Sequence, residues 1–215
     1  MEVDDFALLD QWGSGDRGAG NTLLMRHFDT VYRFFVGKIG NDTEVDDLIQ
    51  RVFLACVESR DRFRREAAFR TFLLAVARHE LFRHFRQNRT RGARSESLGS
   101  MSVAELAEGG GSVRAAMVRR EEERLLLSAL REIPLDLQIT IELHYWEGLT
   151  TAELATVLEI PQGTVKSRLR RAREALHEAM ARISKDAGTL ESTISNFEHW
   201  AVQVRERVAE ARGAT

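Results

Sequence analysis

The chain has 215 residues, of which 43% are hydrophobic and 30% are charged, with two prolines and one cysteine. This composition is typical of a soluble, helix-rich protein. The composition excludes collagen-like and mucin-like chains. A membrane-spanning chain is also excluded, because no apolar run approaches the roughly 18 residues that a membrane span requires. The N-terminus is acidic where a secretion signal would be basic, so we expect a cytoplasmic protein. Cys56 cannot form a disulfide within the chain and lies in the apolar pattern VFLACV, which predicts an inert core thiol.

The net charge of −2 conceals a strong alternation along the chain. The segment charges are −6 for residues 1–58, +8 for 59–94, −7 for 95–160, +5 for 161–185 and −2 for 186–215. Two basic islands between acidic stretches indicate a polyanion held at two places, with the acidic stretches available for a basic protein partner. Solvated helix faces would give the same alternation, so charge alone does not decide between the two interpretations.

The first group of predicted elements runs from Asp5 to about Phe85, where apolar residues recur at helical spacing and predict a compact helical module. One of its helices is expected to begin at Thr43, because carboxylates follow in the first turn and turn-forming residues precede it. Asn88–Ser112 is rich in Gly, Ser and Arg, which predicts a flexible linker with one short helix at Val103–Glu108.

A second helical module is expected from Ala115 to Ile183, and an amphipathic stretch follows it. Apolar residues in that stretch alternate at steps of four and three, and Trp200 lies beside them. They are Leu190, Ile194, Phe197, Ala201, Val204 and Val208. Strand signals are absent. We therefore expect an all-α protein with helical domains at 1–87 and 115–185, a linker at 88–114 and a C-terminal helical extension at 186–215.

Residues 150–176 have the pattern of a helix-turn-helix. Thr151 is expected to cap the first helix, and Pro161 to end the turn before the second. Val165 and Leu169 are spaced to pack back on the first helix. The outward face would then carry residues that reach base edges or phosphates. These are Gln162, Thr164, Lys166, Ser167, Arg168, Arg170 and Arg171. A helical hairpin with a basic surface is the plainer alternative.

Two long motifs carry a family resemblance. GTVKSRLRRAREAL, preceded by LHYWEGLTTAELATVLEIP, resembles region 4 of the sigma-70 family, specifically the short extracytoplasmic-function (ECF) group of bacterial sigma factors. EVDDLIQRVFLACVESRDRFRREAAFRTFLLAVARHELFRHFRQ resembles region 2 of the same family. The resemblance implies a protein that is not an enzyme. Such a protein brings core RNA polymerase to a promoter, recognises the minus-35 element with region 4 and opens the minus-10 element with region 2.

The resemblance also implies roles for single residues. The outward residues of the second helix would read the minus-35 element, and region 4 would contact the β flap. Asp46, Asp47, Gln50 and Arg51 would contact the clamp helices of the polymerase β′ subunit. An opened minus-10 strand requires a cationic track with sites for unstacked bases. That track would consist of Arg62, Phe63, Arg64, Arg65, Arg70, Arg78, His79, Arg83 and Arg86, whereas Phe69 and Phe72 are expected in the core.

Some residues depart from the family pattern. His79 stands where Asn is common, Arg83 where Asp is common, and Arg51 where Glu is usual. Because the clamp helices are expected to be basic, Arg51 predicts weaker binding to core polymerase, unless neighbouring acids compensate. A more specific hypothesis is that a Ser/Thr kinase phosphorylates Thr43 or Ser59, because the added negative charge would strengthen binding to core polymerase. An anti-sigma factor or the C-terminal extension would be the other routes of control.

Catalytic interpretations find no support in the sequence. The histidines lack metal-ligand spacing, and Gly109–Gly111 lacks the lysine of a phosphate-binding loop, so we expect no metal and no cofactor. The alternatives are a stand-alone helix-turn-helix regulator and a polymerase-binding inhibitor that has lost its DNA contacts. A regulator needs no module like region 2, and an inhibitor should lack the abundant basic groups.

Overall fold

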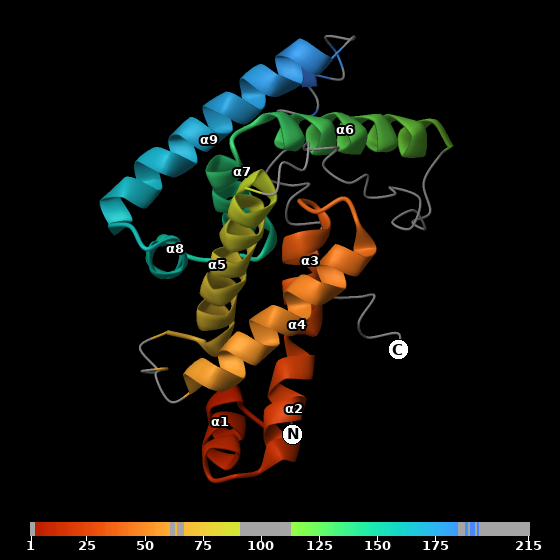
Figure 1. The fold of residues 1–215 in the computed structure, drawn as a ribbon. Coiled ribbons are helices and arrows are strands. Elements are labelled where there is room, and N and C mark those ends of the chain that lie inside the picture. The colour runs from red at the N-terminus through yellow and green to blue at the C-terminus, as the bar shows by residue number, and fades with distance from the viewer. Residues whose placement is uncertain are drawn as a thin grey trace. The chain divides into compact units, whose positions relative to one another are not determined.

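The computed structural model describes residues 3–60, 63, 67–90, 113–184, 188, 190, 191 and 193. Within these residues all regular structure is helical, and the prediction of an all-α fold is confirmed. The chain divides into two compact units, one built on α1 to α5 and the other on α6, α7, η3, the first half of α8 and α9 (Figure 1). Most of the predicted linker, including the short helix expected at Val103–Glu108, lies outside the described residues.

The helices of the N-terminal unit are α1 (Asp5–Gly13), α2 (Arg17–Arg26), α3 (Phe28–Val36), α4 (Asp42–Ser59) and α5 (Phe69–Thr90). Side chains cap the starts of α1, α2 and α4. Asp4 caps α1, Asp16 caps α2 and Asn41 caps α4 by accepting hydrogen bonds from backbone N–H groups of the first turn. The expected start of α4 at Thr43 is wrong by one residue. Asn41 Oδ1 accepts from the Thr43 N–H at 3.0 Å, so the helix begins at Asp42.

The core of this unit lies where α3, α4 and α5 pack against one another, with α4 crossing α5 (Figure 1). Its centre is apolar, and each of its main side chains is exposed by 1% or less. They are Phe35, Leu48, Val52, Leu73, Leu74 and Leu81. Cys56 is also buried, and burial raises the pKa of its thiol to about 12. The prediction of an inert core thiol is confirmed, because the thiolate is the reactive form.

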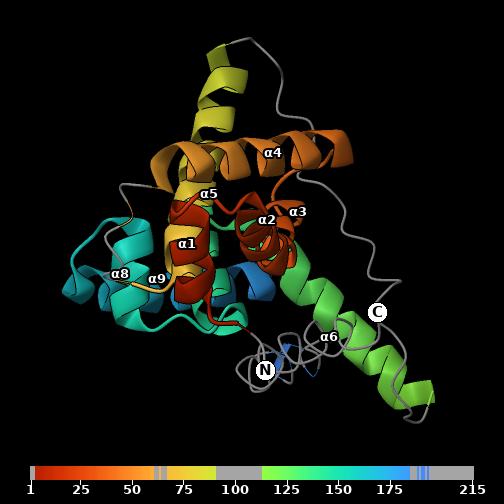
Figure 2. The ribbon, with the colours of Figure 1, turned by 90° about the horizontal axis from the view of Figure 1, so that it is seen from below.

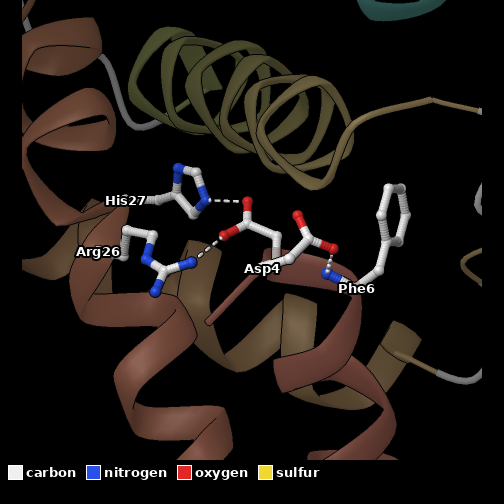
Figure 3. A network of polar contacts seen from close by, with 5 residues as sticks. Asp4, Phe6, Arg26 and His27 are labelled. Atoms are coloured by element: carbon white, nitrogen blue, oxygen red, sulfur yellow. Dashed lines mark hydrogen bonds and ion pairs between the residues drawn. The ribbon is translucent and has the colours of Figure 1, made fainter. Parts of the chain in front are cut away.

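A half-buried polar network ties α1 to the junction of α2 and α3 (Figure 3). The Asp5 carboxylate accepts hydrogen bonds from Arg26 Nη1 and from His27 Nε2, both at 2.7 Å. The His27 ring also packs against Phe69, with 5.6 Å between ring centroids. Burial lowers the pKa of His27 below its ordinary value of 6.5, although the hydrogen bond to Asp5 opposes this shift. The site therefore favours the neutral imidazole.

The α1–α2 hairpin depends on a glycine. The two helices lie side by side, as Figure 2 shows from below. A Cβ atom on Gly20 would lie 2.6 Å from Nε1 of the buried Trp12 ring, which is closer than carbon and nitrogen atoms can pack. Arg60 covers the same indole, with its guanidinium 5.3 Å from the ring centroid. Gly20 is thus required by close packing.

The C-terminal unit consists of α6 (Val113–Glu132), α7 (Leu135–Ile141), the π-helical turn η3 (Glu142–Trp146), α8 (Thr151–Leu158) and α9 (Gln162–Ile183). Helix α9 packs on both α6 and α7. One continuous apolar cluster lies between them, formed by Leu125, Leu126, Ala129, Leu130, Ile133, Ile141, Ala172, Leu176, Ala179 and Met180. We call it the α6–α9 cluster.

Helices extend into both ends of the predicted linker. Helix α5 continues to Thr90, past the expected linker start at residue 88, and Asn88 Nδ2 lies 3.0 Å from His84 Nε2 one turn earlier. Such a contact between residues i and i+4 supports the last turn of a helix. Helix α6 begins at Val113, before the expected domain start at Ala115.

Candidate functional site

The helix-turn-helix is formed by α8, a short turn and α9. Thr150 and Glu153 make a capping box at the start of α8: Glu153 Oε2 accepts from the Thr150 N–H at 2.8 Å, and Thr150 Oγ1 accepts from the Glu153 N–H at 3.2 Å. The expectation that Thr151 caps this helix is therefore wrong. The Thr151 hydroxyl instead accepts a hydrogen bond from Gln162 Nε2 at 2.9 Å, which links the starts of α8 and α9.

Helix α9 has one buried face and one polar face. Val165 and Leu169 are 0% and 5% exposed, as their spacing predicts. Of the seven residues expected on the outward face, Thr164 and Arg168 are half-buried, and Arg168 Nε has no hydrogen-bond partner within the described part of the chain. The other five are exposed: Gln162, Lys166, Ser167, Arg170 and Arg171. The exposed residues are the ones that a nucleic acid could reach.

A basic stripe runs along the polar face of α9. Lys166, Arg170 and Arg173 are spaced at i, i+4 and i+7 and are all exposed. Arg170 forms an ion pair with Glu174 at 3.0 Å, and Arg173 lies 6.0 Å from the centroid of the Tyr145 ring. An exposed ion pair of this kind is weak and yields easily to a phosphate. Arg173 is absent from the sequence prediction, although the helical spacing from Lys166 would have identified it.

A second basic stripe lies on α5. His79, Arg83 and Arg86 are exposed and share one helical face, with Arg83 paired to Glu80 at 3.2 Å. Arg78 lies beside this stripe and is half-buried, with its guanidinium 5.1 Å from the centroid of the Phe82 ring. The structure thus brings four of the expected minus-10 residues together on one helix.

The remaining expected minus-10 residues precede or begin α5. Arg62, Arg64 and Arg65 lie outside the described residues, and Arg70 is half-buried in the first turn of α5. Phe63 is half-buried in an aromatic cluster with Phe69 and Phe72, at centroid distances of 6.0 and 4.9 Å. The expectation that Phe69 belongs to the core is confirmed, since it is 2% exposed, and Phe72 is half-buried beside it.

The exposed face of α4 combines polar and apolar side chains. All four residues expected to contact polymerase lie on it and are exposed, namely Asp46, Asp47, Gln50 and Arg51. Leu54 and Val57 continue the same face with exposures of 59% and 47%. We call these six residues the α4 face. The polar residues thus occupy the N-terminal part of this face and the apolar residues its C-terminal end, and such a mixture is common in protein interfaces.

Leu54 and Val57 are missing from the sequence prediction, which considered the charges of α4 and not the apolar residues beside them. The helical period carried the signal, because the buried residues Val45, Leu48, Val52 and Cys56 define the opposite side of the helix.

The two hydroxyls at the ends of α4 differ in accessibility. Thr43 is exposed in the first turn, where the positive end of the helix dipole favours an anion. Ser59 is half-buried at the other end, and its hydroxyl donates a hydrogen bond to the backbone carbonyl of Ala55. Thr43 is therefore the more accessible of the two expected modification sites.

The described residues contain neither a metal-binding cluster nor a membrane-spanning helix. Among them, no group of three or more His, Cys, Asp or Glu side chains is arranged to hold a metal ion. Within the same part of the chain, no helix combines the length and the apolar character needed to cross a bilayer.

Comparison with known proteins identifies the two units. The family model Sigma-70 region 2 matches residues 23–91, and the model Sigma-70, region 4 matches residues 123–176. The RNA polymerase sigma-H factor of Pseudomonas aeruginosa is 28% identical over 192 residues, which cover 86% of this chain and 98% of that protein. The ECF RNA polymerase sigma-E factor of Escherichia coli K12 is 28% identical over 181 residues, covering 81% and 93%.

Solved structures agree on the fold. CnrH, in complex with the cytosolic domain of CnrY, matches with a TM-score of 0.60 and 22% identity, covering 85% of this chain and 100% of that one. The sigma factor RpoE of Bartonella quintana, in complex with the anti-sigma factor NepR, matches with a TM-score of 0.59 and 18% identity, covering 77% and 98%. With both modules present in order, the chain belongs to the sigma-70 family and to its ECF group.

Proposed function

We propose that this chain is an initiation factor that binds core RNA polymerase and directs it to promoters with a minus-35 and a minus-10 element. The observation that carries this function is the presence of both sigma modules in one chain, each with an exposed surface suited to its partner. The factor itself is not catalytic and requires no cofactor. Because core polymerase and promoter DNA are its partners, we place its action in the cytoplasm.

We assign minus-35 recognition to the domain at residues 115–185, through the first half of α9. A helix of this kind enters the major groove with its N-terminal residues directed at base edges. Gln162 and Ser167 can bond base edges or phosphates, and the basic stripe Lys166, Arg170 and Arg173 supplies charge against the DNA backbone. The half-buried Arg168 would have to change its side-chain conformation to take part.

We assign the minus-10 element and core binding to the domain at residues 1–87. The second basic stripe, which consists of His79, Arg83 and Arg86 on α5, supplies cations for an unpaired strand. The segment between α4 and α5, which contains Phe63, comes before this stripe in the chain. The α4 face supplies apolar contact area through Leu54 and Val57, and on its N-terminal part it supplies Asp46 and Asp47, which suit a basic partner such as the β′ clamp helices. The β flap would be contacted by the C-terminal domain.

Control by a partner follows from the same surfaces. The sigma factor RpoE, which has a similar fold, is found in a complex with the anti-sigma factor NepR, and CnrH is found in a complex with the cytosolic domain of CnrY. The exposed apolar residues of the α4 face would also suit an anti-sigma partner. Phosphorylation by a Ser/Thr kinase stays a prediction, and Thr43 is its better-placed target.

A stand-alone helix-turn-helix regulator is the alternative function. It would use α8 and α9 in the same way but would leave the α4 face and the α5 stripe without a role.

A pair of matched variants tests the assignment of α9. Lys166→Ala and Arg182→Ala remove equal charge from opposite ends of the helix, and both side chains are exposed. In a holoenzyme, Lys166→Ala should weaken binding to a minus-35 promoter by about 5- to 150-fold if Lys166 reads a base, and Arg182→Ala should leave it unchanged. The double variant Lys166→Ala and Arg170→Ala should fail to initiate there. Normal initiation by this double variant would refute the assignment.

A further inference from the structure

The chain turns back onto the C-terminal unit after α9. Helix α9 ends at Ile183, where the Ser184 N–H donates to the Met180 carbonyl at 2.8 Å. Leu190 is half-buried and packs against the α6–α9 cluster, and Thr193 is 4% exposed. Both residues are helical and lie three positions apart, so they share one helical face. The start of the C-terminal extension therefore packs, through Leu190, on the core of the C-terminal unit.

A groove on the second half of α9 lies next to that core. It has a volume of about 270 Å³ and is lined mainly by apolar surface from Arg173, Glu174, Leu176, His177 and Met180. Leu176 and Met180 belong to the α6–α9 cluster, against which Leu190 packs. The rim residue Arg173 also belongs to the basic stripe. The groove thus shares Leu176 and Met180 with the cluster on which Leu190 packs, and it shares Arg173 with the basic stripe that we assign to DNA binding.

The sequence beyond Thr193 fits this groove. Residues 194–215 lie outside the described residues, and the apolar stripe that begins at Leu190 continues through them at helical spacing to Val208. Because Leu190 already faces the cluster, a continuing helix would turn Ile194 and Phe197 to the same side. From residue 188 to 208 such a helix would measure about 30 Å, close to the length of the 22-residue α9.

Charge supports the same pairing for the first part of the extension only. Residues 186–200 contain three acidic residues and no Lys or Arg, whereas residues 201–208 contain Arg205, Glu206 and Arg207. The acidic first part suits α9, which contains six basic residues and two acidic ones. For the rest of the segment the match to the groove is apolar.

We propose that residues 194–208 bind in cis to the α9 groove as an amphipathic helix and cover Arg173 at the edge of the basic stripe. The structural part of this proposal is independent of transcription. Its consequence, that the extension and minus-35 DNA compete for Arg173, rests on the proposed function.

Hydrogen exchange on the full chain tests the docking without polymerase or DNA. Amides of residues 174–183 should exchange about tenfold more slowly in the full chain than in a chain lacking residues 194–215. A chain lacking only residues 209–215, which lie beyond the stripe, should match the full chain. Phe197→Asp should mimic the long deletion, whereas Asn196→Asp, which introduces the same charge at the adjacent position outside the apolar stripe, should not.

Two results would overturn the proposal. One is equal exchange in the full and shortened chains, and the other is protection that disappears on dilution and so comes from a second copy. Since the assay contains neither polymerase nor DNA, a failure here is distinguishable from a failure of the proposed function, which would show as lost initiation with the protection intact.

Discussion

The apolar part of the α4 face provides a quantitative test of core binding. Leu54→Ala removes a side chain that is 59% exposed in the free chain. Burying a whole leucine side chain is worth about 1.5–3 kcal/mol, so burial of the exposed part by polymerase is worth about 1–2 kcal/mol. The variant should therefore bind core polymerase about 5- to 30-fold more weakly.

Competition for core polymerase against a labelled parent chain measures this loss. Met25→Ala is the matched control, because Met25 is 55% exposed and lies on α2, outside the α4 face. It should compete like the parent, and urea denaturation should confirm that both variants are folded. Parental affinity of Leu54→Ala, or an equal loss with Met25→Ala, would refute the assignment of this face.

Three further outcomes follow from single residues. Arg51→Glu on the α4 face should bind core polymerase about 5- to 30-fold more tightly in the same competition assay, and unchanged affinity would remove the reason for a phosphorylation switch. Because burial lowers the pKa of His27, its imidazole binds a proton more readily in the unfolded chain than in the folded one. The contribution of His27 to stability is therefore present above about pH 6.5 and is lost as the pH falls below that value. His27→Gln should flatten this pH dependence of the free energy of unfolding, as measured by urea titrations across that range. Gly20→Ala should lower the free energy of unfolding by about 1–2 kcal/mol, as a clash with Trp12 outweighs the gain in helix propensity, whereas Gly13→Ala, with open space around its Cβ, should not destabilise; a stabilised Gly20→Ala would contradict the packing.

The sequence identified the architecture because helical period, turn residues and two family motifs all pointed to it. The burial of Val165 and Leu169 was predictable from spacing alone. The capping residues of the helices were harder to predict, because several neighbouring polar side chains can occupy the same cap position. Asn41 caps α4 in place of Thr43, and Thr150 caps α8 in place of Thr151.

Contacts between distant parts of the chain were not predictable. Asp5 meets His27 only once α1 and α2 have folded together, and no pattern in the sequence records that pairing. The burial of Lys38 was not predictable either, although its partner is local: the side chain is 1% exposed, and its ammonium donates to the Phe34 carbonyl one turn earlier at 2.7 Å. A charged side chain of this kind is expected at the surface until its partners are known.

Run-off transcription with the core RNA polymerase of the same organism tests the central claim most directly. Genomic DNA is transcribed with core polymerase alone and with the chain added, and the 5′ ends of the transcripts are mapped. The chain should produce new start sites that share two upstream motifs at a constant spacing, and these starts should disappear with the Lys166→Ala and Arg170→Ala double variant. A chain that binds DNA but gives no new start sites with core polymerase would contradict the account and leave the stand-alone regulator as its function.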